Sequence, residues 1–123
     1  MVITDKHFEA MVDAAVAAIA PKYKDRLQNV AFLIQADPDE EQRQRLRLRA
    51  DQTLFGLYEG VPLPQRNGAT KLLPDKITLF MNPLLAASAS SAQLQENVRH
   101  TIWHEVAHYF GLDHERISEL DGS

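Results

Sequence analysis

The chain contains no cysteine, a single tryptophan and only 7% aromatic residues among its 123 residues. Without cysteine there is neither a disulfide framework nor a thiolate ligand for a metal ion. The same absence fits a reducing compartment, so we expect a cytoplasmic location. Any metal must then be bound by nitrogen or oxygen atoms, and the five histidines become the residues to follow.

The chain also lacks an excess of positive charge. Its 13 lysine and arginine residues are outnumbered by 17 aspartate and glutamate residues, which gives a net charge of -4. Binding to nucleic acid needs clustered cations on one surface, so no nucleic-acid partner is expected. One short basic cluster, from Arg43 to Arg49, alternates with uncharged residues beside acidic ones, as is typical of a solvated helix or ribbon.

Long hydrophobic runs are missing as well. The longest run near the N-terminus, Ala14–Ala20, is too short to span a bilayer, and neither a signal peptide nor a membrane partner is expected. The length and the 45% hydrophobic content suit one compact domain over residues 1–123, without linkers or repeats. The sequence leaves the oligomeric state open.

The order of predicted elements indicates an α+β fold. Apolar residues at helical spacing predict a first helix from Thr4 or Asp5 to Pro21 and a last one from Ser91 to Gly111. Between them the sequence predicts strands at 29–35, 54–58 and 76–81, a helix at 40–52, a turn at 81–83 and a loop at 65–70, with a short closing helix at 116–120.

The last long helix carries the most specific motif. Residues 104–114 read H-E-x-x-H-x-x-G-x-x-H, and three of the five histidines fall within these eleven residues. Residues four apart on a helix lie about 6 Å apart along its axis on the same side, so His104 and His108 can bind one ion. This spacing predicts a zinc site.

The remaining motif residues complete a catalytic type of site. Glu105 points about 100° away from His104, which suits a general base better than a ligand. Gly111 can adopt the left-handed conformation that ends a helix, and this lets His114 turn back as a third ligand. A fourth position then stays available for water, as in catalytic zinc sites.

Other residues are predicted to assist. His100 lies one helical step before His104 but about 12 Å of helix rise from His108, so it is expected to support a ligand or to face solvent. The oxyanion that develops in carbonyl hydrolysis needs a donor besides zinc. Tyr58, Tyr109 or an arginine could serve, and the sequence does not choose among them.

Four segments together resemble the family of small bacterial zincin-like metallopeptidases: Phe8, Leu54–Gly60, Leu73–Phe80 and the histidine motif. The third histidine after a glycine is similar to the metzincin branch, although the methionine turn of that branch is absent. The resemblance implies a minimal zincin fold, a short mixed sheet packed with an N-terminal helix and a C-terminal active-site helix. Zinc would be bound by His104, His108 and residue 114. Relatives in this family often carry an acidic residue at that last position, from which His114 departs, so the resemblance leaves Asp113 as an alternative ligand.

The function predicted from this motif is zinc-dependent hydrolysis of peptide bonds in a peptide or protein substrate, with zinc activating a water molecule and Glu105 as general base. Two alternatives stay open. The chain could be a zinc-binding regulatory or interaction domain with little or no catalysis, or a zinc hydrolase that acts on another amide or ester.

Overall fold

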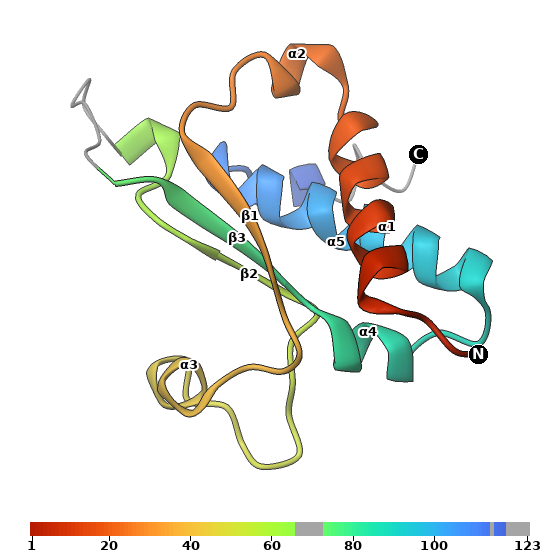
Figure 1. Ribbon diagram of the computed structural model, residues 1–123. Helices are drawn as coiled ribbons and strands as arrows, with labels where there is room; N and C mark the ends of the chain where they lie inside the picture. The colour runs from red at the N-terminus through yellow and green to blue at the C-terminus, as the bar shows by residue number, and fades with distance from the viewer. Residues whose placement is uncertain (66–72, 114, 118–123) are drawn as a thin grey trace.

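The computed structural model describes residues 1–65, 73–113 and 115–117 (Figure 1). Helices precede and follow a small mixed sheet, which confirms the predicted α+β class. In chain order the elements are α1 (Asp5–Ala17), α2 (Pro21–Lys24), β1 (Val30–Gln35), α3 (Glu40–Arg45), β2 (Gly56–Glu59), the 3-10 helix η1 (Leu63–Gln65), β3 (Asp75–Phe80), α4 (Met81–Ala86) and α5 (Ser91–Tyr109).

The three strands form one sheet in the order β1-β3-β2. Strand β1 runs parallel to β3, with Val30 opposite Asp75, whereas β2 runs antiparallel to β3, with Gly56 opposite Leu79. Parallel neighbours need a long crossover connection, and here the crossover contains α3 and β2. The central strand β3 is therefore the most buried one, and β2 lies at an edge of the sheet.

The core lies between the sheet, α5 and α1. Helix α5 packs across β2 and β3, and α1 packs against α5 (Figure 1). Burial of this apolar surface supplies the main driving force for folding. The predicted stripe of α5 is at most 1% exposed at Leu94, Val98, Ile102 and Val106, and it meets Phe8 of α1 and Ile77 and Leu79 of β3 in one buried cluster.

Specific residues set both ends of α5. The hydroxyl of Ser90 caps the start of the helix by accepting from the Gln93 backbone N–H at 3.1 Å. At the other end Gly111 has a φ of 73°, as predicted, and its N–H donates to the His108 carbonyl at 3.0 Å. A side chain at 111 would also lie 2.8 Å from Pro64 Cγ, so glycine is needed there for space as well.

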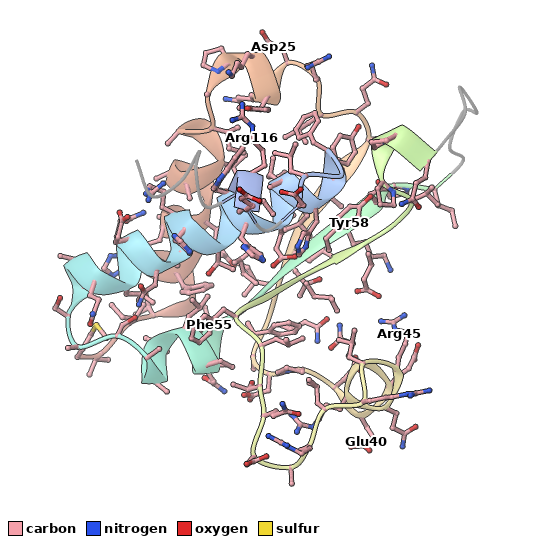
Figure 2. The ribbon with its side chains drawn as sticks, turned by 180° about the vertical axis from the view of Figure 1, so that it is seen from behind. Asp25, Glu40, Arg45, Phe55, Tyr58 and Arg116 are labelled. Atoms are coloured by element: carbon pink, nitrogen blue, oxygen red, sulfur yellow. The ribbon has the colours of Figure 1, made fainter. Side chains whose placement is uncertain are left out.

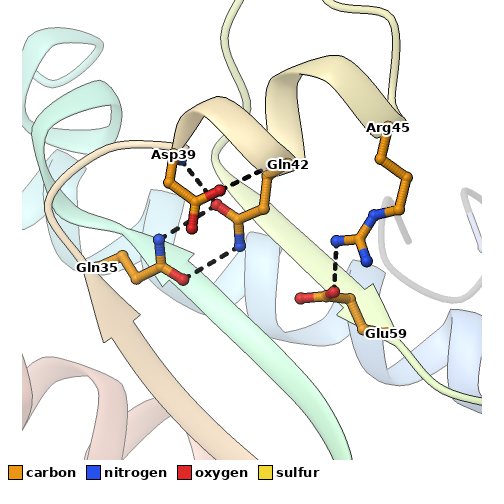
Figure 3. A network of polar contacts seen from close by, with 5 residues as sticks. All are labelled: Gln35, Asp39, Gln42, Arg45 and Glu59. Atoms are coloured by element: carbon orange, nitrogen blue, oxygen red, sulfur yellow. Dashed lines mark hydrogen bonds and ion pairs between the residues drawn. The ribbon is translucent and has the colours of Figure 1, made fainter.

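A polar network fastens α3 to the sheet (Figure 3). The Asp39 carboxylate accepts from the Gln42 N–H at 2.8 Å, and the Gln42 side-chain oxygen accepts from the Asp39 N–H at 2.9 Å, which forms a capping box. The Gln42 and Gln35 amides also donate to each other at 3.1 and 3.2 Å. Arg45 forms a 2.5 Å ion pair with Glu59 of β2. Together these bonds hold α3 beside β1, through Gln35, and beside β2, through Glu59.

Replacing Gln42 by alanine is expected to lower the free energy of unfolding by about 1–3 kcal/mol. Gln42 is 6% exposed, so the change removes its amide bonds and leaves the Gln35 amide and the Asp39 N–H without this partner. Urea denaturation followed by circular dichroism measures the loss. Gln44→Ala is the matched control, because Gln44 is exposed on the same helix and should change stability by less than about 0.5 kcal/mol. Equal losses would contradict the structural role of Gln42.

Several predicted elements were wrong in type or extent. Residues 81–83, predicted as a turn, begin helix α4, because a proline in the first turn of a helix costs no hydrogen bond. Helix α3 ends at Arg45 rather than at residue 52, and Arg47 has a φ of 56°, which a helix cannot contain. Helix α2, which starts at Pro21, was not predicted, and β2 starts at Gly56 instead of Leu54.

Two further predictions fall wholly or partly on residues that are not described. The loop at 65–70 lies outside the described residues after position 65, and the closing helix at 116–120 does so after position 117. Residues 115–117 form one helical turn. Within the described part of the chain, no helix has the length and apolar character needed to cross a membrane.

Candidate metal centre

Three side chains of the predicted motif gather near the C-terminal end of α5. One ligand atom from each of His104, Glu105 and His108 can be chosen so that all three lie within 4.8 Å of one another. The two imidazole rings have centroids 4.7 Å apart and planes inclined at 72°. Glu105 is 6% exposed, whereas both histidines are half-buried. The helix therefore brings two nitrogen donors and one carboxylate to a single point that stays accessible to solvent.

Glu105 and His108 interact directly. The Nδ1 atom of His108 lies 3.1 Å from Oε1 of Glu105. This hydrogen bond to the carboxylate raises the pKa of His108 above its usual range, while partial burial acts in the opposite direction. In the tautomer with the proton on Nδ1, His108 donates to Glu105 and leaves Nε2 to bind a metal. The carboxylate thus orients the ring beside it.

The close approach of β2 explains why Glu105 is buried. A Cβ atom at Gly56 would lie 2.6 Å from Thr101 Cγ2, 3.2 Å from Glu105 Cγ and 3.3 Å from the Thr78 carbonyl oxygen. Only glycine lets the strand lie this close to α5 without displacing these atoms. The start of β2 therefore covers the Glu105 side chain from one side, and burial of a carboxylate requires a partner such as His108.

The donor set fits zinc. Histidine nitrogen and carboxylate oxygen are ordinary zinc ligands with bonds of about 2.0–2.2 Å, so two ligand atoms on one ion lie within about 4.4 Å of each other. The chosen atoms of His104, Glu105 and His108 lie within 4.8 Å of one another, close to this span. A proton competes with the metal at a histidine ligand, and the raised pKa of His108 moves this competition to higher pH.

The third ligand stays a prediction. His114 lies outside the described residues. The alternative, Asp113, is exposed, and its carboxylate accepts from the Arg116 backbone N–H at 2.8 Å. Among the described residues Asp113 does not join the group formed by His104, Glu105 and His108. Its observed contact is that of a cap on the helical turn at 115–117.

The hydroxyl groups of both tyrosines considered as oxyanion donors form hydrogen bonds within the protein. The Tyr109 side chain is fully buried, and its hydroxyl accepts from the Gln28 N–H at 3.2 Å and donates to the Arg26 carbonyl at 3.4 Å. It therefore anchors the segment between α2 and β1. The Tyr58 hydroxyl donates to the Asp75 carboxylate at 2.7 Å. Figure 2 shows Tyr58 on the β2 strand, near the end of α5.

His100 lines a cleft next to the histidine pair. The cleft has a volume of about 430 Å³ and is bordered by His100, Thr101, His104 and Glu105 of α5 and by residues 53–56 of the chain leading into β2. Sequence reasoning found the helical side of this cleft but missed the opposite wall. The one available signal was Gly56, which lies in the segment that carries the family resemblance and permits the close contact.

Comparisons with known proteins give a similar solved structure and a matching family. A conserved hypothetical protein from the bacterium T. thermophilus has a similar structure, with a TM-score of 0.59 and 20% sequence identity over 97% of this chain and 98% of that chain. This likeness supports the fold alone. No curated protein matches at a comparable level. The family model described as zincin-like metallopeptidase matches residues 27–123, which include all strands and the whole histidine motif, so the chain belongs to the zincin-like metallopeptidase family.

Proposed function

We propose that the protein is a zinc-dependent peptidase. The observation that carries the proposal is the convergence of His104, Glu105 and His108 on one point beside an open cleft. His104 and His108 would hold the metal together with His114. Membership of the zincin-like family supports the same assignment.

Each described residue has a defined task in the proposed reaction. When bound, zinc would supply Lewis acidity, which polarises a carbonyl group and lowers the pKa of a water molecule. Glu105 would accept the proton of the attacking water and return it to the leaving nitrogen. Its Oε1 atom lies 3.1 Å from His108 Nδ1, and Glu105 lines the cleft. His100 would lie at the cleft as a further hydrogen-bonding group.

A peptide is the substrate that the surroundings favour. Strand β2 is the outermost strand on its side of the sheet, and the cleft begins where this strand starts. An extended peptide can add to the edge of a sheet through main-chain hydrogen bonds while one of its side chains occupies a neighbouring pocket. An extended substrate along β2 would thus pass the Glu105 carboxylate.

A peptide-library assay tests the proposal directly. Tag-free protein reconstituted with zinc should contain about one zinc per chain and cleave library peptides, and a chelator should stop the cleavage until zinc is restored. Elemental analysis and mass spectrometry of the products give the two readouts. Stoichiometric zinc without any cleavage would overturn the peptidase assignment and favour a zinc-binding domain instead.

A further inference from the structure

A second cavity lies on the side of α5 that faces away from the histidine pair. It has a volume of about 300 Å³, and its walls come from the end of α1, the turn at residues 18–20, α2 and α5, whose positions Figure 1 shows. Arg99, Ile102 and Trp103 are the α5 residues that line it, and they lie about 100–160° from His104 around the helix axis. The cavity therefore shares no residue with the cleft beside the histidines, and its volume reaches the range of small-molecule sites.

Small and apolar side chains form most of the cavity wall. Alanines stand at positions 15, 18 and 20, and Ile19 and Ile102 are 8% and 1% exposed. Two aromatic rings complete the wall, because Tyr23 packs on Trp103 with ring centroids 5.0 Å apart and planes inclined at 58°. Such a surface favours a ligand with an apolar body, and the two rings favour an aromatic one.

Trp103 also carries a hydrogen-bond donor that is not used within the protein. Its Nε1 atom is buried and has no hydrogen-bond partner in the part of the chain that the structure describes. A buried donor without a partner destabilises a fold, and such groups are rare in native proteins. A ligand that offers an acceptor oxygen would supply the partner.

Lys22 adds a positive charge to the cavity. Its Nζ atom lies 5.1 Å from the centre of the Tyr23 ring, and no ion pair of Lys22 is found among the described residues. Arg99 lines the cavity as well, but its guanidinium is already paired with Glu96 at 2.6 Å. Lys22 is therefore the cation that can pair with an anionic ligand.

We propose that this cavity binds a small organic anion, a monocarboxylate with an aromatic body. The apolar body would lie against the alanines and the rings of Tyr23 and Trp103. The carboxylate would pair with Lys22, and its second oxygen would accept from Trp103 Nε1. The inference does not depend on the proposed peptidase function, because the two sites share no residue.

Trp103 is the single tryptophan of the chain, so its fluorescence reports on the cavity directly. Titration of the protein with 3-phenylpropionate should change this fluorescence saturably, with a dissociation constant on the order of 0.1–1 mM. The neutral compound 3-phenylpropanamide has the same ring and should bind at least about threefold more weakly, and acetate, which lacks the ring, should cause no change. No saturable change with 3-phenylpropionate, or equal affinities for the acid and the amide, would overturn the proposal.

Matched substitutions locate the bound compound. Ala18→Leu fills the cavity and should weaken binding of 3-phenylpropionate at least about tenfold, whereas Ala14→Leu, at an exposed position of α1 outside the cavity, should not change it. Lys22→Gln should weaken binding at least about threefold, and Lys24→Gln on the same helix is its control. Circular dichroism shows that each variant is folded. Unchanged affinity in Ala18→Leu or in Lys22→Gln would overturn the site.

Trp103→Phe tests the buried donor, because phenylalanine keeps an aromatic ring and lacks the N–H. Calorimetry replaces fluorescence for this variant and should give an affinity for 3-phenylpropionate at least about threefold lower than that of the unmodified protein. An affinity that stays the same would overturn the proposed pairing of the carboxylate with Nε1.

Discussion

Replacing Glu105 by glutamine is expected to lower kcat by about two to four orders of magnitude while zinc stays bound at one ion per chain. The amide cannot accept a proton from water, so the general base is lost. Its side-chain oxygen can still accept the hydrogen bond from His108 Nδ1, now 3.1 Å from the carboxylate, so the ring should keep its orientation. Steady-state rates on a cleaved library peptide and elemental analysis of the same sample measure both quantities.

Glu96→Gln provides the matched control for this substitution. Glu96 lies on the same helix, faces solvent and pairs with Arg99 instead of the histidines. Its replacement should leave turnover unchanged. Two results would contradict the assignment of Glu105 in different ways. Unchanged turnover would remove it from the reaction, whereas loss of zinc together with turnover would make it a metal ligand, because its carboxylate lies within the same group of donor atoms.

The geometry within α5 could be predicted from the sequence because it depends on local helix parameters. His104 and His108 are four residues apart, so any regular helix places them on one side, and the apolar stripe tells which side is buried. The structure confirms the buried stripe and the left-handed Gly111. Contacts set by one helix thus follow from periodicity alone.

The rest of the site depends on contacts between segments far apart in the sequence. The wall at residues 53–56 meets α5 only because β2 joins β3 in antiparallel order, and no local pattern encodes that pairing. The tyrosine hydroxyls are a second case. Tyr109 reaches the Gln28 N–H and Tyr58 reaches Asp75 through tertiary packing, so sequence spacing could not predict these two contacts.

The helix boundaries predicted from the sequence were wrong for a related reason. Local composition indicated Pro83 as a helix breaker, although the third position of a helix tolerates proline. The polar run after Glu40 reads as a long helix, but the chain turns at Arg47 and continues toward the cleft wall. In both places the tertiary fold decides between local conformations of similar free energy.

Replacing His104 or His108 by alanine is expected to weaken zinc binding by at least about a hundredfold and to abolish turnover. Each substitution removes one nitrogen donor from a group whose atoms lie within 4.8 Å of one another, and solvent replaces a protein ligand. Competition with a chromogenic zinc chelator measures the affinity. The raised pKa of His108 also affects the pH dependence of zinc binding. As the pH is lowered, the zinc affinity of the unmodified protein should begin to fall at a higher pH than it would with an unperturbed histidine, because a proton competes with the metal.

His100→Ala is the matched control for the metal site. His100 lies one helical step before His104 and is exposed at the rim of the cleft, so its loss should change zinc affinity by less than about threefold. His114→Ala and Asp113→Asn then separate the two predicted third ligands, and only the first should weaken binding, because the Asp113 carboxylate caps the turn at 115–117. A loss of zinc in His100→Ala as large as in His108→Ala would contradict the site, because one ion cannot be shared by residues about 12 Å apart along a helix.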